Sequence, residues 1–150
     1  MKIEKSRGIT PTETLLSRLC DRTFLKLWSY SNPIKADGKE LCDLIAVFED
    51  QVFLFFDRES RQFDQNPDVY LTWERWKRNV IYRQIATARG AQRYLSDPKN
   101  LVFLDQERTV PLPIRLPASP RFHKIVVAHG AALACREFSD ENVAGSLGIW

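Results

Sequence analysis

Residues 38–59 read GKELCDLIAVFEDQVFLFFDRE, and the other elements of the chain are organised around them. Two apolar runs, 41–48 and 52–56, are separated by Glu49, Asp50 and Gln51. Neither run alternates cleanly between apolar and polar residues, which predicts strands that are covered on both faces. The short polar connection predicts that the two strands pair as an antiparallel hairpin.

Charged residues stand at both ends of this hairpin. Asp43 lies at the entry of the first strand, and Asp57, Arg58 and Glu59 follow the second. An unpaired carboxylate beside a buried strand costs free energy, so Asp43 is expected to meet a cation or hydrogen-bond donors. The triplet at the exit has two interpretations, a functional site or a strand end that returns to solvent.

A helix is expected before the hairpin. Thr10, Pro11 and Glu13 form a helix start in which Thr10 is the N-cap and Glu13 completes a capping box. The helix is expected to continue to about Trp28. Its apolar stripe at helical spacing consists of Leu16, Leu19, Cys20, Thr23, Leu27 and Trp28.

A longer helix is expected after the hairpin, from residue 69 to about residue 96, with Asp68 as its cap. One side, which includes Gln84, is expected to pack against the core, and Arg83 and its basic neighbours are expected to face solvent. The packed side consists of Trp73, Trp76, Val80, Gln84 and Ala91. The outer face carries Arg75, Lys77, Arg78, Arg83, Arg89 and Arg93.

Four further strands and one short helix complete the expected elements. The strands are 34–36, 101–104, 122–128 and 145–150, and the helix is about 130–138. Residues 110–116 alternate apolar side chains with prolines, which excludes a central strand and predicts an edge or an extended arm. The chain stops on an apolar run, so we expect a fragment of a longer protein or a surface that pairs with a second copy.

Length and composition limit the number of domains and the class of protein. A chain of 150 residues and 17.4 kDa predicts a single domain, 1–150. The net charge of +3 permits a polyanionic partner without demanding one. Apolar runs such as 52–56 are far shorter than the ~20 residues that cross a bilayer. Three widely spaced cysteines predict free thiols, so we expect a cytoplasmic protein that does not span a membrane.

The order of these elements resembles the core of the PD-(D/E)XK nuclease superfamily. That core is an α/β fold of the restriction-endonuclease type (α-β-β-β-α-β), with a mixed sheet flanked by helices. More narrowly, residues 38–43, the Phe-rich second strand, the pair Trp73 and Trp76, and residues 145–147 resemble uncharacterised bacterial proteins with an N-terminal nuclease-related (NERD-like) domain. The resemblance covers nearly the whole chain.

The resemblance implies a magnesium-dependent endonuclease that acts on DNA. Hydrolysis of a phosphodiester is helped by a divalent cation, and Mg²⁺ takes oxygen ligands. Asp43, Asp57 and Glu59 are then the expected metal ligands, and Arg58 the group that holds phosphate. Glu13 is expected to join the site from the first helix, and the residues expected to contact nucleic acid are Lys39, Arg58 and Arg83.

The motif can be aligned in two ways. If Arg58 takes the place of the family's lysine, Phe56 stands where the second metal-binding carboxylate belongs, and a phenyl ring binds no metal. If Asp57 and Glu59 form the motif, two acids share one strand face and Glu59 replaces the lysine. Three hypotheses therefore stay open: an active nuclease, an inactive nuclease-like domain that binds nucleic acid, and a module for protein interaction.

Overall fold

A mixed four-stranded sheet lies at the centre of the computed structural model, which describes residues 8–23, 28–58, 69–128 and 136. The protein therefore has the α/β class that the sequence predicts. The helices are α1 (Pro11–Thr23), α2 (Val69–Trp76), the π-helical η1 (Lys77–Tyr82) and α3 (Arg83–Leu95). The strands are β1 (Ser29–Ser31), β2 (Ile34–Lys35), β3 (Leu44–Phe48), β4 (Gln51–Arg58), β5 (Val102–Phe103) and β6 (Arg121–Ala128).

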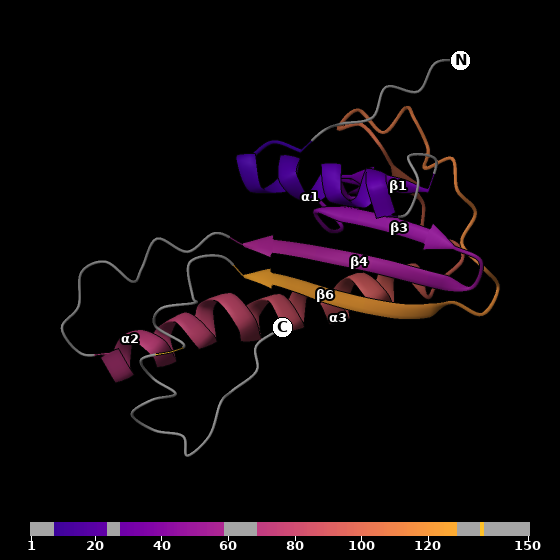
Figure 1. Ribbon diagram of the computed structural model, residues 1–150. Coiled ribbons are helices and arrows are strands. Elements are labelled where there is room, and N and C mark those ends of the chain that lie inside the picture. Colours follow the sequence, from indigo (N-terminus) through magenta and orange to yellow (C-terminus); the bar gives the residue numbers. More distant parts are fainter. Residues whose placement is uncertain (1–7, 24–27, 59–68, 129–135, 137–150) are drawn as a thin grey trace.

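The main sheet combines antiparallel and parallel pairing in the order β1-β3-β4-β6 (Figure 1). β1 pairs with β3 and β3 with β4, both antiparallel, whereas β6 runs parallel to β4 along its full length. The chain returns to this parallel strand through the long helix that follows β4. A separate two-stranded sheet pairs β2 with β5.

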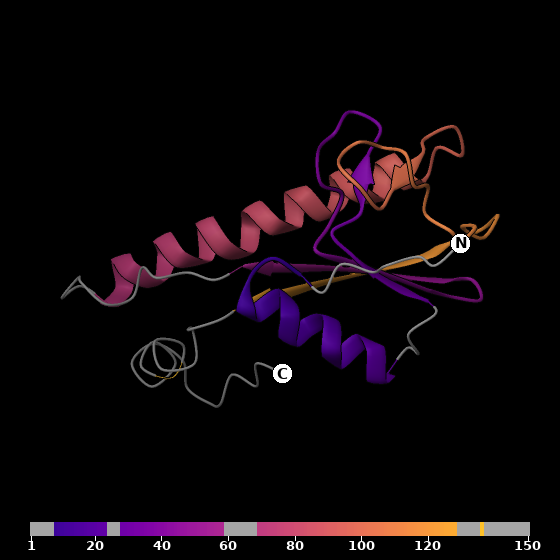
Figure 2. The same cartoon turned by 90° about the horizontal axis from the view of Figure 1, so that it is seen from above.

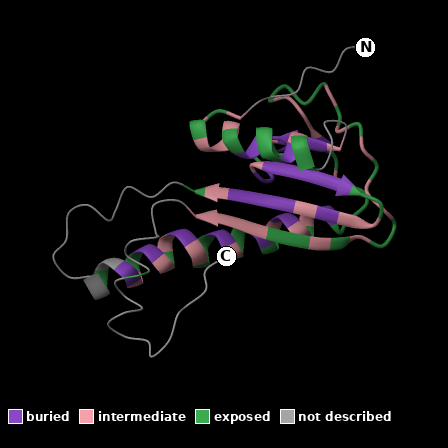
Figure 3. Ribbon diagram, in the orientation of Figure 1, coloured by how far each residue is buried: buried purple, intermediate pink, exposed green. Residues whose placement is uncertain are grey.

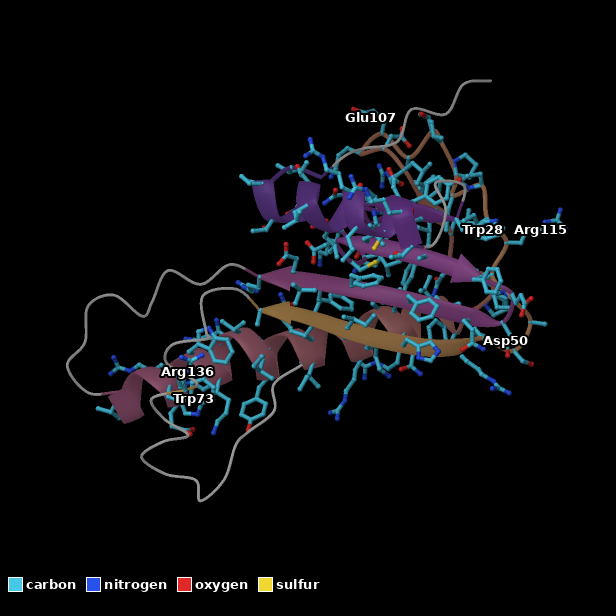
Figure 4. All side chains as sticks on the ribbon, in the orientation of Figure 1. Trp28, Asp50, Trp73, Glu107, Arg115 and Arg136 are labelled. Carbon is cyan, nitrogen blue, oxygen red and sulfur yellow. The ribbon has the colours of Figure 1, made fainter. Side chains whose placement is uncertain are left out.

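The predicted hairpin is confirmed. Phe48 pairs with Gln51, so β3 and β4 are joined by Glu49 and Asp50 alone. Glu49 has φ of 52°, in the left-handed region. Asp50 holds the end of the turn against the start of β6, because its Oδ2 lies 3.1 Å from Nε of Arg121; Figure 4 shows it at this end of the sheet.

Helices cover the two faces of the sheet (Figure 2). On one face, α1 packs through Leu16 and Cys20 on Leu44, Ala46 and Phe55. On the other face, α3 covers a cluster that includes Ile45, Val47, Val52, Leu54 and Phe56. Side chains of a strand alternate between the faces, and because both faces are covered, Phe48 and Arg58 are the only exposed residues of β3 and β4 (Figure 3).

The predicted long helix is present as α2, η1 and α3 in direct succession. Its expected packed side is confirmed, because Trp73, Trp76, Val80, Gln84 and Ala91 are all buried. The two indole rings stack with centroids 5.1 Å apart. Five of the expected outer residues are exposed, and Lys77 is half-buried in an ion pair with Glu74. The π-helical turn was not predicted.

The first helix begins as predicted and ends earlier. Oγ1 of Thr10 accepts a hydrogen bond from the backbone N of Glu13 at 3.2 Å, and Oε2 of Glu13 accepts one from the backbone N of Thr10 at 3.3 Å. Trp28, near which the helix was expected to end, is not helical, because its carbonyl accepts from the backbone N of Val47; residues 24–27 lie outside the described residues. Leu19 is 56% exposed, which removes it from the apolar stripe.

Most of the remaining expectations are confirmed. β2, β5 and β6 lie within a residue or two of the expected strands. The proline-rich segment is an extended arm, because the backbone N of Leu112 donates to the carbonyl of Val102 and its apolar side chains pack on the core. Cys20 and Cys42 are free and buried.

Several expectations lie outside the described residues: the cap at Asp68, the strand 145–150, the thiol of Cys135, and nearly all of the helix 130–138. Within the described ranges, no helix is long and apolar enough to cross a membrane.

Candidate functional site

One pocket of about 400 Å³ collects most of the charged residues that the sequence singles out. It lies where α1 begins, where the chain enters β3 and where β4 ends, with α3 alongside. Four carboxylate residues and one arginine share its wall. The lining residues are Thr10, Thr12, Glu13, Glu40, Leu41, Cys42, Asp43, Phe56, Asp57, Arg58, Gln84 and Thr87.

Asp43 is held at the entry of β3 by the strand beside it. Its Oδ2 accepts a hydrogen bond from the backbone N of Asp57 at 2.7 Å, and its own backbone N donates to the carbonyl of Phe55 at 3.1 Å. The expected donor is therefore the amide of Asp57. Burial raises the pKa of the Asp43 carboxyl to about 6, with the nearby carboxylates of Glu40, Glu13 and Asp57 also raising it and the amide hydrogen bond opposing them.

Glu13 serves the helix and the pocket together. Its Oε2 accepts from the backbone N of Thr10 and, at 2.7 Å, from that of Ile9, which closes the first turn of α1. Because that turn forms one wall of the pocket, the cap carries a carboxylate into the site. The two roles expected for Glu13 are compatible.

Glu40 is the acidic residue that the sequence interpretation missed. Glu40 lines the pocket, and its Oε1 accepts from Nδ2 of Asn32 at 2.7 Å. Burial of the Glu40 carboxyl raises its pKa, and the charge of Glu13 raises it further. The sequence indicates only that Glu40 lies three residues before Asp43. Its place in the pocket depends on how the chain reverses between β2 and β3, which a sequence pattern does not predict.

The end of β4 divides its residues between the two faces of the sheet. Phe55 packs with α1 and Phe56 with α3, so alternation places Asp57 on the α1 side and Arg58 on the α3 side. Phe56, two positions before Arg58 on the α3 side, is only 2% exposed and has no oxygen to offer a metal.

The long helix contributes Gln84 and Thr87 to the pocket. Gln84 is 6% exposed, so the expected packing role is confirmed, and the same side chain lines the site. Arg83 and Lys39, expected to contact nucleic acid, are exposed and lie outside the pocket lining. Glu59 lies beyond the described part of β4.

The chemistry of the pocket suits a hard cation. Carboxylate oxygens from Glu13, Glu40, Asp43 and Asp57 are the donors that Mg²⁺ prefers. Their mutual repulsion, which raises the pKa of Asp43, would be relieved by a cation. Within the described ranges, no three His, Cys, Asp or Glu side chains are arranged closely enough to hold an ion. The metal ligands expected from the sequence include Glu59, which lies outside the described ranges.

Comparison of the chain with family models, with curated proteins and with solved structures gave no match.

Proposed function

We propose that this protein is a metal-dependent nuclease that hydrolyses phosphodiester bonds in DNA. The observation that carries the proposal is the convergence of Glu13, Asp43 and Asp57 with Arg58 in one pocket. All four are among the site residues that the sequence predicts for this chemistry, and they reach the pocket from three separate parts of the fold. Carboxylate oxygens are the groups that Mg²⁺ prefers, and a guanidinium is a group that binds phosphate.

The connectivity supports the same proposal. A helix, three antiparallel strands, a long helix and a parallel fourth strand follow one another as α1, β1, β3, β4, α2 to α3, and β6. This order is similar to the α-β-β-β-α-β order expected of a restriction-endonuclease-like core, if β2 and β5 are counted as additions to it. The pocket lies at the ends of the two central strands, where such a core would place its site.

The pocket residues have separable roles in this proposal. Asp43 and Asp57 would hold Mg²⁺, which on binding lowers the pKa of a water molecule and offsets charge on the phosphate. The backbone N–H of Asp57 donates to Oδ2 of Asp43. This hydrogen bond orients the Asp43 carboxyl and leaves its Oδ1 for a ligand. Arg58 would bind a phosphate oxygen through two N–H groups, since its proton is held too tightly for base chemistry.

The test is cleavage of plasmid and linear DNA by purified protein with and without Mg²⁺. We expect Asp43→Ala to lose at least about 100-fold of the magnesium-dependent rate, because the metal-supported path is removed. Asp50→Ala is the matched control, because Asp50 lies in the turn at the far end of the same hairpin. If Asp43→Ala cleaves like the wild type, the assignment is wrong.

A second candidate is a nuclease-like domain that binds nucleic acid without cleaving it. Phe56 favours this candidate, because this buried phenyl ring stands where the alignment with Arg58 as the family's lysine would need a second carboxylate. Here Arg58 and the exposed arginines of the long helix would contact phosphates. Binding that weakens with salt, without cleavage under any divalent cation, is the expected result. Absence of binding at low salt would exclude it.

A further inference from the structure

Asn32 contacts three of the acidic residues of the pocket from outside its lining. It lies between β1 and β2, and its backbone N donates to the carbonyl of Asp43 at 2.9 Å. Its side-chain Nδ2 donates to Oε1 of Glu40 at 2.7 Å and approaches Oε2 of Glu13 at 3.4 Å. One asparagine thus joins the helix cap, the segment before β3 and the strand entry.

The backbone at this position is fixed. Asn32 has φ of 52°, a conformation that asparagine and glycine adopt far more readily than most residues. Pro33 follows and is almost fully buried, and its carbonyl accepts from the backbone N of Leu41 at 2.8 Å. The turn therefore presents the amide of Asn32 to the pocket from an anchored position.

A neutral donor is well suited to this place. The carboxylates of Glu13 and Glu40 repel each other, and an N–H group between them offsets part of the repulsion. A lysine or arginine would also do so, but it would cancel negative charge that a bound cation needs. Asn32 supplies the hydrogen bonds and leaves the charge of the pocket unchanged.

We propose that Asn32 is a positioning residue, whose amide holds Glu13 and Glu40 together on one wall while its backbone fixes Asp43 at the start of β3. In this role Asn32 acts through Glu13, Glu40 and Asp43. The effect of Asn32 on catalysis rests on the nuclease function proposed above. The hydrogen bonds from Asn32 to Glu13, Glu40 and Asp43, which we call the clamp, are a property of the folded chain.

The clamp is tested first without any activity. The side-chain NH₂ resonances of Asn32 are identified in a ¹⁵N–¹H spectrum by their loss in Asn32→Gly. We expect Glu40→Gln to shift them, because the charged acceptor is replaced, and Glu107→Gln, an exposed control, to leave them in place. Resonances that stay unchanged in Glu40→Gln overturn the proposal, whether or not the protein cleaves DNA.

The functional arm compares Asn32→Gly with Asn32→Asp. Both replacements tolerate the positive φ, so a purely backbone role predicts near wild-type rates for both. A clamp predicts a fall in kcat of about 10- to 100-fold with little change in the Kd for DNA, and the larger fall in Asn32→Asp. Equal rates in all three proteins overturn the positioning role. A wild type that cleaves nothing counts against the nuclease function alone, since the resonances still decide the clamp.

Discussion

At the scale of single residues, Asp43 links the stability of the protein to its site. Its carboxyl has a pKa of about 6 in the folded protein, against 3.8 in an unfolded chain. The folded state therefore holds this proton more tightly than the unfolded state. The contribution of Asp43 to stability is most favourable below pH 4 and is lost as the pH rises through 6.

Replacing the carboxyl by an amide should remove that cost. We expect Asp43→Asn to raise the free energy of unfolding at pH 7 by about 1–2 kcal/mol, reduced from the full shift because the group is partly exposed to solvent. Oδ1 of asparagine can still accept from the amide of Asp57. Urea denaturation at pH 7 and at pH 4 checks the prediction, and the gain should be small at pH 4. A destabilised variant at pH 7 would show that the carboxylate is paired more strongly than its surroundings indicate.

At the scale of elements, the hairpin turn carries an unfavourable backbone conformation. Glu49 has a positive φ, and its neighbour Asp50 anchors the turn to β6. We expect Glu49→Gly to raise the free energy of unfolding by about 0.5–1 kcal/mol, because glycine adopts this region without steric cost. Thermal unfolding measures the change. Gln51→Gly, two residues later at the start of β4, is the control and should destabilise. A loss of stability in Glu49→Gly would mean that its side chain matters more than its backbone.

Substitutions in the first turn of α1 can distinguish the capping of the helix from the charge that Glu13 adds to the pocket. We expect Thr10→Ala to cost about 1 kcal/mol, because the backbone N of Glu13 loses its acceptor. Glu13→Gln should cost less than that, since the amide oxygen can still accept from Ile9 and Thr10, while it removes one negative charge from the site. Chemical denaturation of both variants, read with their magnesium affinities, distinguishes the two roles. A weakened affinity in Thr10→Ala but not in Glu13→Gln would contradict this division.

The elements that could be predicted are those whose pattern is long. The hairpin, the long helix and β6 each show enough apolar residues to identify their type, and the capping box is a local signal. β1 could not be found, because Ser29, Tyr30 and Ser31 become a strand only by pairing with β3. Gln84 was placed correctly on the packed side, but whether that side also borders a pocket depends on where β3 begins and β4 ends.

At the scale of the whole molecule, charge is distributed unevenly. The chain carries a net charge of +3, yet the pocket gathers Glu13, Glu40, Asp43 and Asp57 against the single cation Arg58. Folding brings these acids together from distant parts of the sequence. Such repulsion opposes folding until a cation enters, so the stability of the whole domain should respond to divalent ions.

Magnesium should therefore raise the melting temperature at pH 7. A ligand that binds only the folded state at 100 times its Kd adds about 2.7 kcal/mol, which corresponds to about 5–10 °C for a chain of this length. Sodium chloride at equal ionic strength controls for screening, and the double variant Asp43→Asn, Asp57→Asn should lose the response while Asp50→Asn keeps it. The effect should also fade towards pH 4, where the Asp43 carboxyl, with its pKa of about 6, is protonated and the proton competes with the metal. If magnesium and sodium raise the melting temperature equally, ionic screening alone relieves the repulsion in the pocket. That result would contradict the metal-dependent function.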